Sequence, residues 1–334
     1  MTFHPQIVQT HAGVRAVLSS PEFSVPGPNA PTSPRGHSQA LLRDVAWLRN
    51  QVSRFSGPQD HPRRRALGVA ELDRIPTGGL RAAARRCCEQ RLAARGAGPV
   101  EVMGALARPV PLDTLAMALG VGAGLAADVA CVARVYPPAA EADPEADAAV
   151  ERLARRCATP AVGERPGHIV GSELCAARIG LLVQACDATA GLIGNAVIAS
   201  ARHSHTGPRA QLLAETLRYS PPVRSTRRVA TAHTTLEHGS IAAGREVHLD
   251  LAAANRDAAV YAQPHRFVPQ RAETQHLAFG FGPRACPGAP HAMALAAGTL
   301  DALESHRVVP DQPTVIHEPT GHLWIPQRVE VDHR

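Results

Sequence analysis

The segment FGFGPRACPG, residues 279–288, places one cysteine on a glycine-rich bend directly before an alanine-rich helical pattern. The thiolate of Cys286 can bind a metal ion if nearby groups stabilise its negative charge. Backbone N–H groups of the bend and the positive end of the following helix can both do so. Gly280 and Gly288 allow the backbone to turn sharply and to approach a flat ligand closely. The pattern therefore indicates a metal-binding thiolate whose ligand is broad and flat.

Two side chains beside the cysteine define the ligand further. Arg284, two residues before Cys286, can reach an anionic group on the same ligand, and Phe279 can cover the sulfur with an apolar surface. A large, flat, anionic group that carries iron satisfies all of these requirements. The segment therefore predicts haem held by a single thiolate, with Phe279, Gly280, Arg284 and Gly288 around it.

The composition favours a helical protein and argues against other metal sites. The chain has 334 residues, of which 45% are hydrophobic and only 3% aromatic, so alanine, leucine and valine must form most of the core. Long stretches of alanine and leucine favour helices over sheets. The 7 cysteines stand at irregular spacings without a C-x-x-C pair, which argues against zinc and iron–sulfur sites.

The charge pattern bears on partners and on location. The formal net charge of +6 comes mainly from arginines, which are scattered along the chain without an aromatic stacking motif. We therefore expect no nucleic-acid partner, whereas an acidic protein would fit the basic balance. We find no apolar run long enough to cross a bilayer and no charged-then-apolar signal peptide at the N-terminus. The sequence favours a cytoplasmic protein without a membrane partner.

Hydrophobic periodicity predicts one large helical domain over residues 1–334, with a small β portion late in the chain. Residues 172–204 are apolar on nearly all sides, as in a helix that is buried along its whole length. Short strands are expected within residues 225–252 and in the tail, 314–333. The predicted helices cover residues 11–19, 39–54, 61–95, a segment that starts near 111, 124–135, 143–157, 172–204, 208–219 and 289–305.

The segment around Cys286 matches the haem-binding signature F-G-x-G-x-(H/R)-x-C-x-G at every defined position, and the chain resembles the cytochrome P450 family. In ETLR, Glu215 and Arg218 lie three residues apart on one helix face and resemble the family's buried E-x-x-R pair. The resemblance covers nearly the whole chain and implies a mainly α fold with small β-sheets, the haem-thiolate fold of cytochrome P450. It also implies haem b, iron protoporphyrin IX, as the cofactor and Cys286 as the iron ligand.

Further positions resemble the family's partners for the haem propionates. DHPRRR places His61 and Arg65 four residues apart, as in the family's H-x-x-x-R. Arg228 falls where the family has another propionate-binding arginine, although Arg227 beside it is a competitor. AAANRD and PHRF also resemble family landmarks. The resemblance thus implies that His61, Arg65 and Arg228 bind the cofactor together with Arg284.

The long apolar helix departs from the family pattern A-G-x-(D/E)-T, which places an acid and an alcohol beside the bound oxygen. In QACDATAG, Asp187 stands at the acid, Ala188 at the alcohol and Thr189 one residue further on. One residue along a helix rotates the side chain by about 100°, so Thr189 is not expected to replace the missing hydroxyl. A substrate hydroxyl or a water held by Asp187 could take its place. Alternatively, the reaction could depend less on oxygen insertion, as in oxidative coupling of aromatic rings.

The resemblance also implies that the family's usual N-terminal helix and first strand are missing, and that the segments roofing the substrate pocket are short. A compact variant of this kind would offer an open pocket to a bulky or carrier-bound small molecule. Family positions suggest substrate contacts in the loop at residues 25–55, on the long helix near Gln184 and Asp187, at residues 223–226 including Val223, and in the tail near Leu323 and Trp324.

By this resemblance the chain is expected to be a haem-thiolate monooxygenase that oxidises a small organic molecule with O2. Electrons would come from an acidic ferredoxin or a flavoprotein that docks on the basic face near Cys286. Natural-product tailoring, by hydroxylation or oxidative coupling, is the expected role by analogy with soluble bacterial members. Two alternatives remain open: a catalytically degenerate haem-binding protein that recruits partners, and a peroxide-driven peroxygenase.

Overall fold

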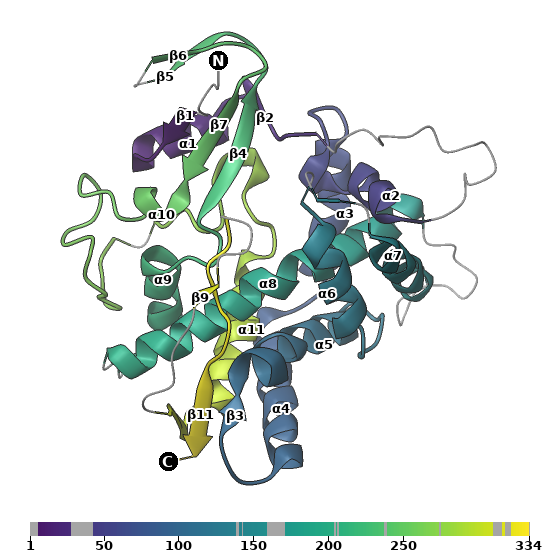
Figure 1. Ribbon diagram of the computed structural model, residues 1–334, viewed down its shortest axis with the longest axis vertical. Coiled ribbons are helices and arrows are strands. Elements are labelled where there is room, and N and C mark those ends of the chain that lie inside the picture. The colour runs from purple at the N-terminus through teal and green to yellow at the C-terminus, as the bar shows by residue number, and fades with distance from the viewer. Residues whose placement is uncertain are drawn as a thin grey trace.

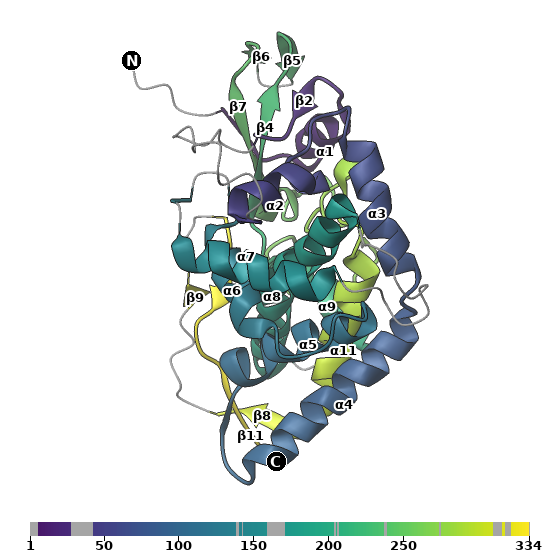
Figure 2. The same cartoon turned by 90° about the vertical axis from the view of Figure 1, so that its right-hand side faces the viewer.

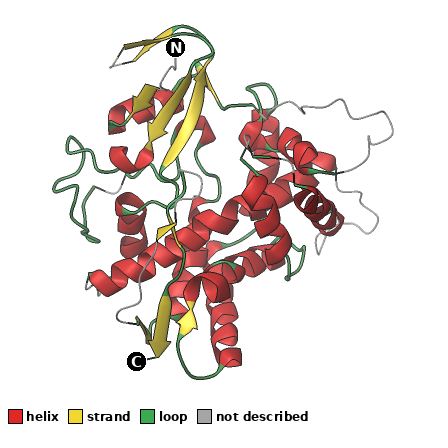
Figure 3. Cartoon of the chain, viewed as in Figure 1, coloured by secondary structure: helices red, strands yellow, loops and turns green. Residues whose placement is uncertain are grey.

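The computed structural model describes residues 6–27, 43–137, 140–141, 143–158, 171–203, 205, 207–236, 239–273, 275–309, 316–317 and 322–333. Within these ranges the chain forms a mainly helical body with small β-sheets, which confirms the predicted fold class (Figure 1 and Figure 3). The α-helices are α1 (His11–Ser19), α2 (Val45–Gln51), α3 (His61–Asp73), α4 (Thr77–Arg95), α5 (Pro109–Ala118), α6 (Ala126–Val135), α7 (Pro144–Cys157), α8 (Ser172–Arg202), α9 (Arg209–Tyr219), α10 (Leu251–Ala254) and α11 (Ala289–Ala302).

The helix α8 forms the centre of the body, and α2, α3, α5, α6, α7, α9 and α11 all pack against it (Figure 2). Its buried side chains include Cys175, Ile179, Leu182 and Ile193, so it is covered along most of its length. By length and a hydropathy of 1.5 it could cross a membrane, and the expectation that no such run exists is wrong. However, 72% of this apolar window is buried inside the protein, as in the core helix of a globular domain.

Two predicted helices differ from the structure in their extent. The run expected over residues 61–95 is divided into α3 and α4, and Pro76 is the N-cap residue of α4. Proline lacks the backbone N–H that a continuous helix needs and disfavours helical backbone in the residue before it. The segment expected over 39–54 contains the shorter α2 and the 3-10 helix η1 (Ser53–Phe55), and residues 39–42 lie outside the described ranges.

A π-helical turn, η2 (Met103–Ala107), precedes α5 and was not expected from the sequence. The backbone N–H of Arg108 donates to the carbonyl oxygen of Met103 at 3.1 Å and closes this turn. Met103 packs so closely on α8 that a Cβ at Gly194 would lie 2.6 Å from its sulfur. Wide turns of this type often occur at functional positions.

The strands form a four-stranded sheet and three smaller ones. The four-stranded sheet has the order β1 (Gln6–Val8), β7 (Glu246–Asp250), β4 (Ser225–Ala230) and β2 (Phe23–Ser24). Strand β7 pairs parallel with β1 and antiparallel with β4. The smaller sheets are β3 (Val100–Glu101), β11 (Glu330–His333) and β8 (His306–Val308); β5 (Thr234–Leu236) with β6 (Gly239–Ile241); and β9 (Ile316–His317) with β10 (Ile325–Pro326).

The four-stranded sheet and α1 lie at one end of the helical body, and β11 lies at the opposite end (Figure 1 and Figure 3). A small apolar core joins this sheet to α1. Leu277 and Phe281 of the cysteine-bearing segment, residues 277–288 around Cys286, pack against this core. The segment continues through the 3-10 helix η3 (Gly282–Arg284) into α11, which belongs to the main helical core. The cysteine therefore lies on the connection between the sheet end and the helical body.

Candidate active site

The cysteine-bearing segment, residues 277–288, is a tight bend that requires glycine at two positions. Gly280 and Gly282 have φ angles of 72° and 69°, in the left-handed region that favours glycine. A Cβ at Gly282 would lie 2.9 Å from the carbonyl oxygen of Leu18 at the end of α1. The backbone N–H of Cys286 donates to the carbonyl oxygen of Phe279 at 2.7 Å. The bend therefore presents the cysteine from a rigid backbone that is pressed against α1.

The thiol of Cys286 is solvent-accessible but closely surrounded by protein. Its side chain is exposed, yet burial is the largest influence on its pKa and raises it. The backbone N–H of Gly288, the N-cap residue of α11, donates to the sulfur and acts in the opposite direction, as does the charge of Arg65. An accessible sulfur in these surroundings suits a metal ligand, because a bound cation deprotonates a thiol outright.

Basic side chains from three separate elements converge on the same region. His61 and Arg65 lie one turn apart on α3, Arg228 lies on β4, and Arg284 lies in η3. Burial, followed by the charges of Arg284 and Arg65, lowers the pKa of His61 to about 4. Burial, followed by the charges of Arg284 and Arg54, lowers the pKa of Arg228 to about 10. The arginines repel one another, which is unfavourable unless an anion lies between them.

None of these arginines contacts a carboxylate among the described residues. Arg228 donates to the hydroxyl oxygen of Thr226 at 3.3 Å and to the carbonyl oxygen of its neighbour Arg227 at 2.8 Å. Arg284 donates to the carbonyl oxygens of Ser53 at 3.5 Å and Ser56 at 2.7 Å. Mutually repelling arginines beside an accessible thiol fit a ligand that carries both a metal and negative charge. The residues present therefore fit haem b, with its two carboxylates.

The predicted pair Glu215–Arg218 is buried and well bonded. The two side chains are 3% and 2% exposed, and Arg218 donates to both carboxylate oxygens of Glu215 at 2.7 Å and 2.8 Å. Arg218 also donates to the carbonyl oxygens of Asn255, Pro264 and Arg266. With its charge paired and its donors used, this arginine acts as a structural centre.

Two residues that complete this network were not singled out from the sequence. Nε of Arg271 lies 3.4 Å from Oε2 of Glu215, and its side chain is only 5% exposed. The side-chain oxygen of Asn255 accepts from the backbone N–H of Leu277 at 2.7 Å. Through Asn255 the Glu215–Arg218 pair is joined to the start of the cysteine-bearing segment. AAANRD was noted as a landmark and contains Asn255, whereas nothing in the sequence distinguished Arg271 from the other arginines.

The acid of the long helix faces a second arginine that was not predicted. Nε of Arg108 lies 3.6 Å from Oδ1 of Asp187, and each side chain is about a third exposed, at 37% and 33%. Ala188 is half-buried beside this ion pair. Thr189 is only 2% exposed and faces the core, as expected from the rotation between neighbouring helix positions. At Ala188, where the family pattern has an alcohol, this chain instead has an ion pair of an acid and an arginine at the neighbouring position.

Four of the positions suggested as substrate contacts fall into two groups. Val223 forms a β-bridge with Leu323, and the backbone N–H of Trp324 donates to the carbonyl oxygen of Pro222. These segments lie against α8, where a Cβ at Gly191 would be 2.7 Å from Pro222. Gln184 lies two turns nearer the start of α8, where its exposed side chain donates to the carbonyl oxygen of Gly180. Their role as substrate contacts stays a prediction.

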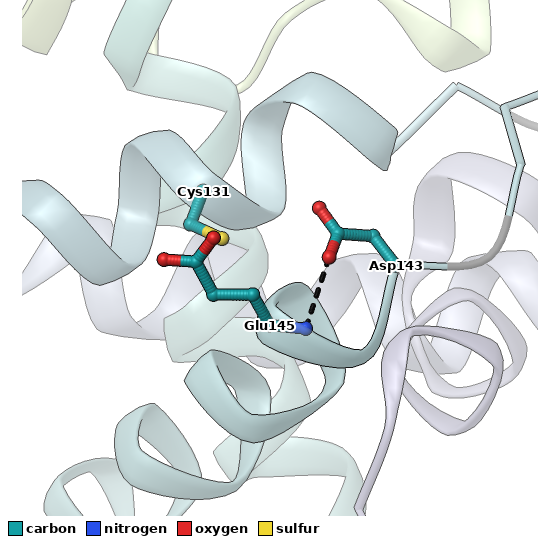
Figure 4. Close-up of side chains that lie close together, drawn as sticks. All are labelled: Cys131, Asp143 and Glu145. Atoms are coloured by element: carbon teal, nitrogen blue, oxygen red, sulfur yellow. Dashed lines mark hydrogen bonds between the residues drawn. The ribbon is translucent and has the colours of Figure 1, made fainter.

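A second group of potential metal ligands lies between α6 and α7 (Figure 4). The ligand atoms of Cys131, Asp143 and Glu145 all lie within 4.8 Å of one another. Arg134 lies among them, 3.4 Å from the sulfur and 3.7 Å and 3.8 Å from the two carboxylates. One oxygen of Asp143 also accepts from the backbone N–H of Glu145, as the N-cap of α7. The arginine already supplies the positive charge that these groups require.

Comparisons with known proteins single out the same part of the chain. The family model described as Cytochrome P450 matches residues 210–327, which include the Glu215–Arg218 pair, Arg228 and Cys286. Cytochrome P450 119 from Sulfurisphaera tokodaii is 36% identical over 115 residues, which are 33% of this chain and 31% of that protein. Cyclomarin C epoxidase CymV from Salinispora arenicola is 39% identical over 92 residues, which are 28% of this chain and 23% of that protein. Both alignments span less than a third of the relative.

Solved structures resemble the chain over nearly its whole length. P450BioI, in complex with hexadec-9Z-enoic acid ligated acyl carrier protein, matches with a TM-score of 0.82 and 19% identity, covering 99% of this chain and 93% of that chain. CalO2 matches with a TM-score of 0.80 and 21% identity, covering 98% and 90%. At these identities the likeness establishes the fold.

Proposed function

We propose that this chain is a haem-thiolate monooxygenase of the cytochrome P450 family, whose family model matches residues 210–327, and that it binds haem b through Cys286. The observation that carries the proposal is the accessible thiol of Cys286 beside Arg65, Arg228 and Arg284, which lack acidic partners in the described part of the chain. Two haem carboxylates would supply the missing negative charge, and buried charge-assisted hydrogen bonds of this kind are strong.

When bound, haem supplies the activation of O2 and the oxidising chemistry. The chain supplies the ligand and its tuning. The Cys286 sulfur accepts a hydrogen bond from the backbone N–H of Gly288, which stabilises the thiolate. The bonds of Arg284 to the carbonyl oxygens of Ser53 and Ser56 hold the cysteine-bearing segment against η1. The network of Glu215, Arg218 and Asn255 fixes the start of the same segment.

Because Ala188 offers no hydroxyl, another group of this chain must deliver protons to the reacting atoms. We assign this role to Asp187, whose carboxylate is partly exposed and is held by Arg108 at 3.6 Å. A carboxylate in this position can hold a water and pass protons through it to the reacting atoms. Arg108 is a positioning residue that orients the carboxylate. A hydroxyl carried by the substrate, or oxidative coupling in place of hydroxylation, would reduce the need for a protein group that delivers protons.

The proposed substrate is a small organic molecule, and the proposed role is natural-product tailoring. Two relatives support this role by their names: the cyclomarin C epoxidase of Salinispora arenicola, and the 20-oxo-5-O-mycaminosyltylactone 23-monooxygenase of Streptomyces fradiae, which is 43% identical over 74 residues. The fold neighbour P450BioI is described with an acyl carrier protein, which makes a carrier-bound substrate a second form to test.

A ferredoxin or a flavoprotein is the proposed electron donor. The chain is basic, with a net charge of +6, and an acidic donor would be attracted to it. A cytoplasmic location accords with the burial of α8 inside the protein.

Turnover of haem-loaded protein tests the proposal. With a ferredoxin and its reductase, NADPH and O2, a monooxygenase converts a ligand that shifts the haem spin state into a product carrying one atom of 18O from 18O2. Turnover with hydrogen peroxide alone would identify a peroxygenase. Binding of haem without product under either condition would identify the degenerate alternative and contradict the proposed activity.

A further inference from the structure

We propose that Arg54 binds an anionic group of the substrate, a carboxylate or a phosphate, at the edge of the haem site. This inference rests on the proposed function and specifies its substrate class. Arg54 is the central residue of η1, and its side chain is exposed whereas the neighbouring Phe55 and Ser56 are buried.

Hydrogen bonds on both sides of Arg54 fix its place beside the site. Arg284 of the cysteine-bearing segment donates to the carbonyl oxygens of Ser53 at 3.5 Å and Ser56 at 2.7 Å. Arg64 of α3 donates to the hydroxyl oxygen of Ser56 at 2.8 Å. After burial and Arg284, Arg54 is the next influence that lowers the pKa of Arg228. The turn therefore holds Arg54 close to the arginines that face the haem carboxylates.

Arg54 adds a positive charge that the cofactor does not require. If Arg65, Arg228 and Arg284 bind the two carboxylates of haem b as proposed, three arginines would oppose two negative charges. In the part of the chain that the structure describes, the side chain of Arg54 contacts aromatic rings and no carboxylate. A fourth arginine is electrostatically unfavourable in this place unless another anion approaches it. A substrate that enters beside the propionates would bring that anion.

Two aromatic rings and a buried hydroxyl continue the site from Arg54 towards α8. The guanidinium carbon of Arg54 lies 5.7 Å from the centroid of the Phe55 ring and 6.0 Å from that of Tyr136. The two rings meet edge to face at 5.1 Å, and both are buried. Cation–π contacts of this kind hold a guanidinium in one orientation without neutralising its charge.

The hydroxyl of Tyr136 is buried and has no hydrogen-bond partner among the described residues. Such a hydroxyl is costly to leave unpaired and is rare in folded proteins. It lies 3.7 Å from the position of a Cβ at Gly180, and the side-chain nitrogen of Gln184 lies 3.7 Å from the same position. Gln184 is on α8, three residues before Asp187. Tyr136 and Gln184 thus connect the surroundings of Arg54 to α8, the helix that carries Asp187.

The test compares three probes with one carbon skeleton: 4-phenylbutyrate, 4-phenylbutyl phosphate and the neutral 4-phenylbutanol. Their Kd values for haem-loaded protein are measured by calorimetry and by the spin-state shift. We expect at least one of the two anions to bind about tenfold more tightly than the alcohol. The affinities of the carboxylate probe and the phosphate probe show which of the two groups the site prefers. Arg54→Gln should remove this preference and leave the alcohol unchanged, whereas Arg54→Lys should retain most of it.

Arg86→Gln is the matched control, because Arg86 is an exposed arginine on α4, which contributes no residue to this site. Haem content and the carbon monoxide spectrum are recorded first, so that failure of the proposed function is seen separately as a missing thiolate signature. If that signature is present, equal or undetectable binding of the anions contradicts the inference. Loss of haem from the Arg54→Gln variant, but not from the control, would assign Arg54 to the cofactor and would also overturn it.

Discussion

Nε of Arg108 lies 3.6 Å from Oδ1 of Asp187, directly beside the residue at which the family pattern has an alcohol and this chain has Ala188. The π-helical turn η2 ends at Ala107, so an unusual backbone geometry delivers this arginine to α8. Arg108 is the ion-pair partner of Asp187 among the described residues, and it defines how the carboxylate is held.

Replacing Asp187 by Asn should reduce product formation by about 10- to 100-fold, because a carboxylate that relays protons cannot be replaced by an amide. Haem content should stay unchanged, and more of the electrons consumed should appear as hydrogen peroxide. Product and peroxide formed per NADPH consumed are the measurements. Arg108→Gln should shift the same ratio less. If the Asn variant kept the wild-type ratio, Asp187 would have no part in proton delivery.

Breaking the Glu215–Arg218 pair should destabilise the protein strongly. Arg218→Met leaves the Glu215 carboxylate buried with fewer partners, and loss of one member of a buried pair typically costs about 3–5 kcal/mol. Urea denaturation of the haem-free protein measures the loss. The exposed pair Arg85–Glu89 is the control, since Glu89→Gln should cost at most about 1 kcal/mol. Equal losses in the two variants would contradict the structural role.

Acid should destabilise the haem-free protein through His61. Burial and two arginines lower its pKa from 6.5 to about 4, so the unfolded chain takes up a proton at a higher pH than the folded chain does. Stability from this residue is therefore present above pH 6.5 and is lost as the pH falls towards 4. The loss is at most about 3 kcal/mol.

The variant His61→Gln isolates this contribution from the titrating carboxylates. Between pH 7 and pH 4.5 the wild type should lose more unfolding free energy than the variant does. In the haem-loaded proteins, the difference in unfolding free energy between the wild type and His61→Gln should be smaller, because the haem carboxylates favour the protonated imidazole. Parallel curves for the two haem-free proteins would show that His61 does not titrate as described.

Substituting Gly282 by Ala should disturb the cysteine-bearing segment more than the φ angle alone explains. The new Cβ would meet the backbone of α1 at 2.9 Å, and a backbone contact cannot yield as a flexible side chain can. Gly96 offers a matched control, because its φ of 79° is similar but nothing lies within 4 Å of its Cβ position. We expect Gly282→Ala to lower the Tm and the haem content, and Gly96→Ala to cost only about 1 kcal/mol of strain. Retention of haem by both variants would contradict the tight fit to α1.

Much of the fold followed from the sequence, because local patterns decide it. The apolar run of α8 is buried along its length, and α6, α7 and α9 begin and end within a few residues of their predicted bounds. Errors occurred where local signals compete. Pro76 divides a run that is otherwise helical, and the π-turn before Arg108 packs against Gly194, a contact between segments far apart in the chain.

The candidate site was predictable where one motif specifies one residue. A short sequence motif was enough to single out Cys286 and its neighbouring glycines. The burial of Glu215 and Arg218 agrees with the motif that indicated them. Arg108 and Arg271 could not be recognised, and Arg54 was one of many residues in the expected substrate loop at 25–55, because the importance of each arises from contacts between segments far apart in the chain. In a protein with 35 arginines and no lysine, only the fold shows which of the arginines share an anion and which lack one.

Ligation by Cys286 is the claim on which the account depends most. The most direct measurement is the absorption spectrum of the reduced, haem-loaded protein under carbon monoxide, compared among the wild type, Cys286→Ala and the control Cys87→Ala. We predict the red-shifted Soret band of thiolate ligation for the wild type and for Cys87→Ala, and its loss in Cys286→Ala. A band typical of histidine ligation in the wild type, or an unchanged spectrum in Cys286→Ala, would contradict the account.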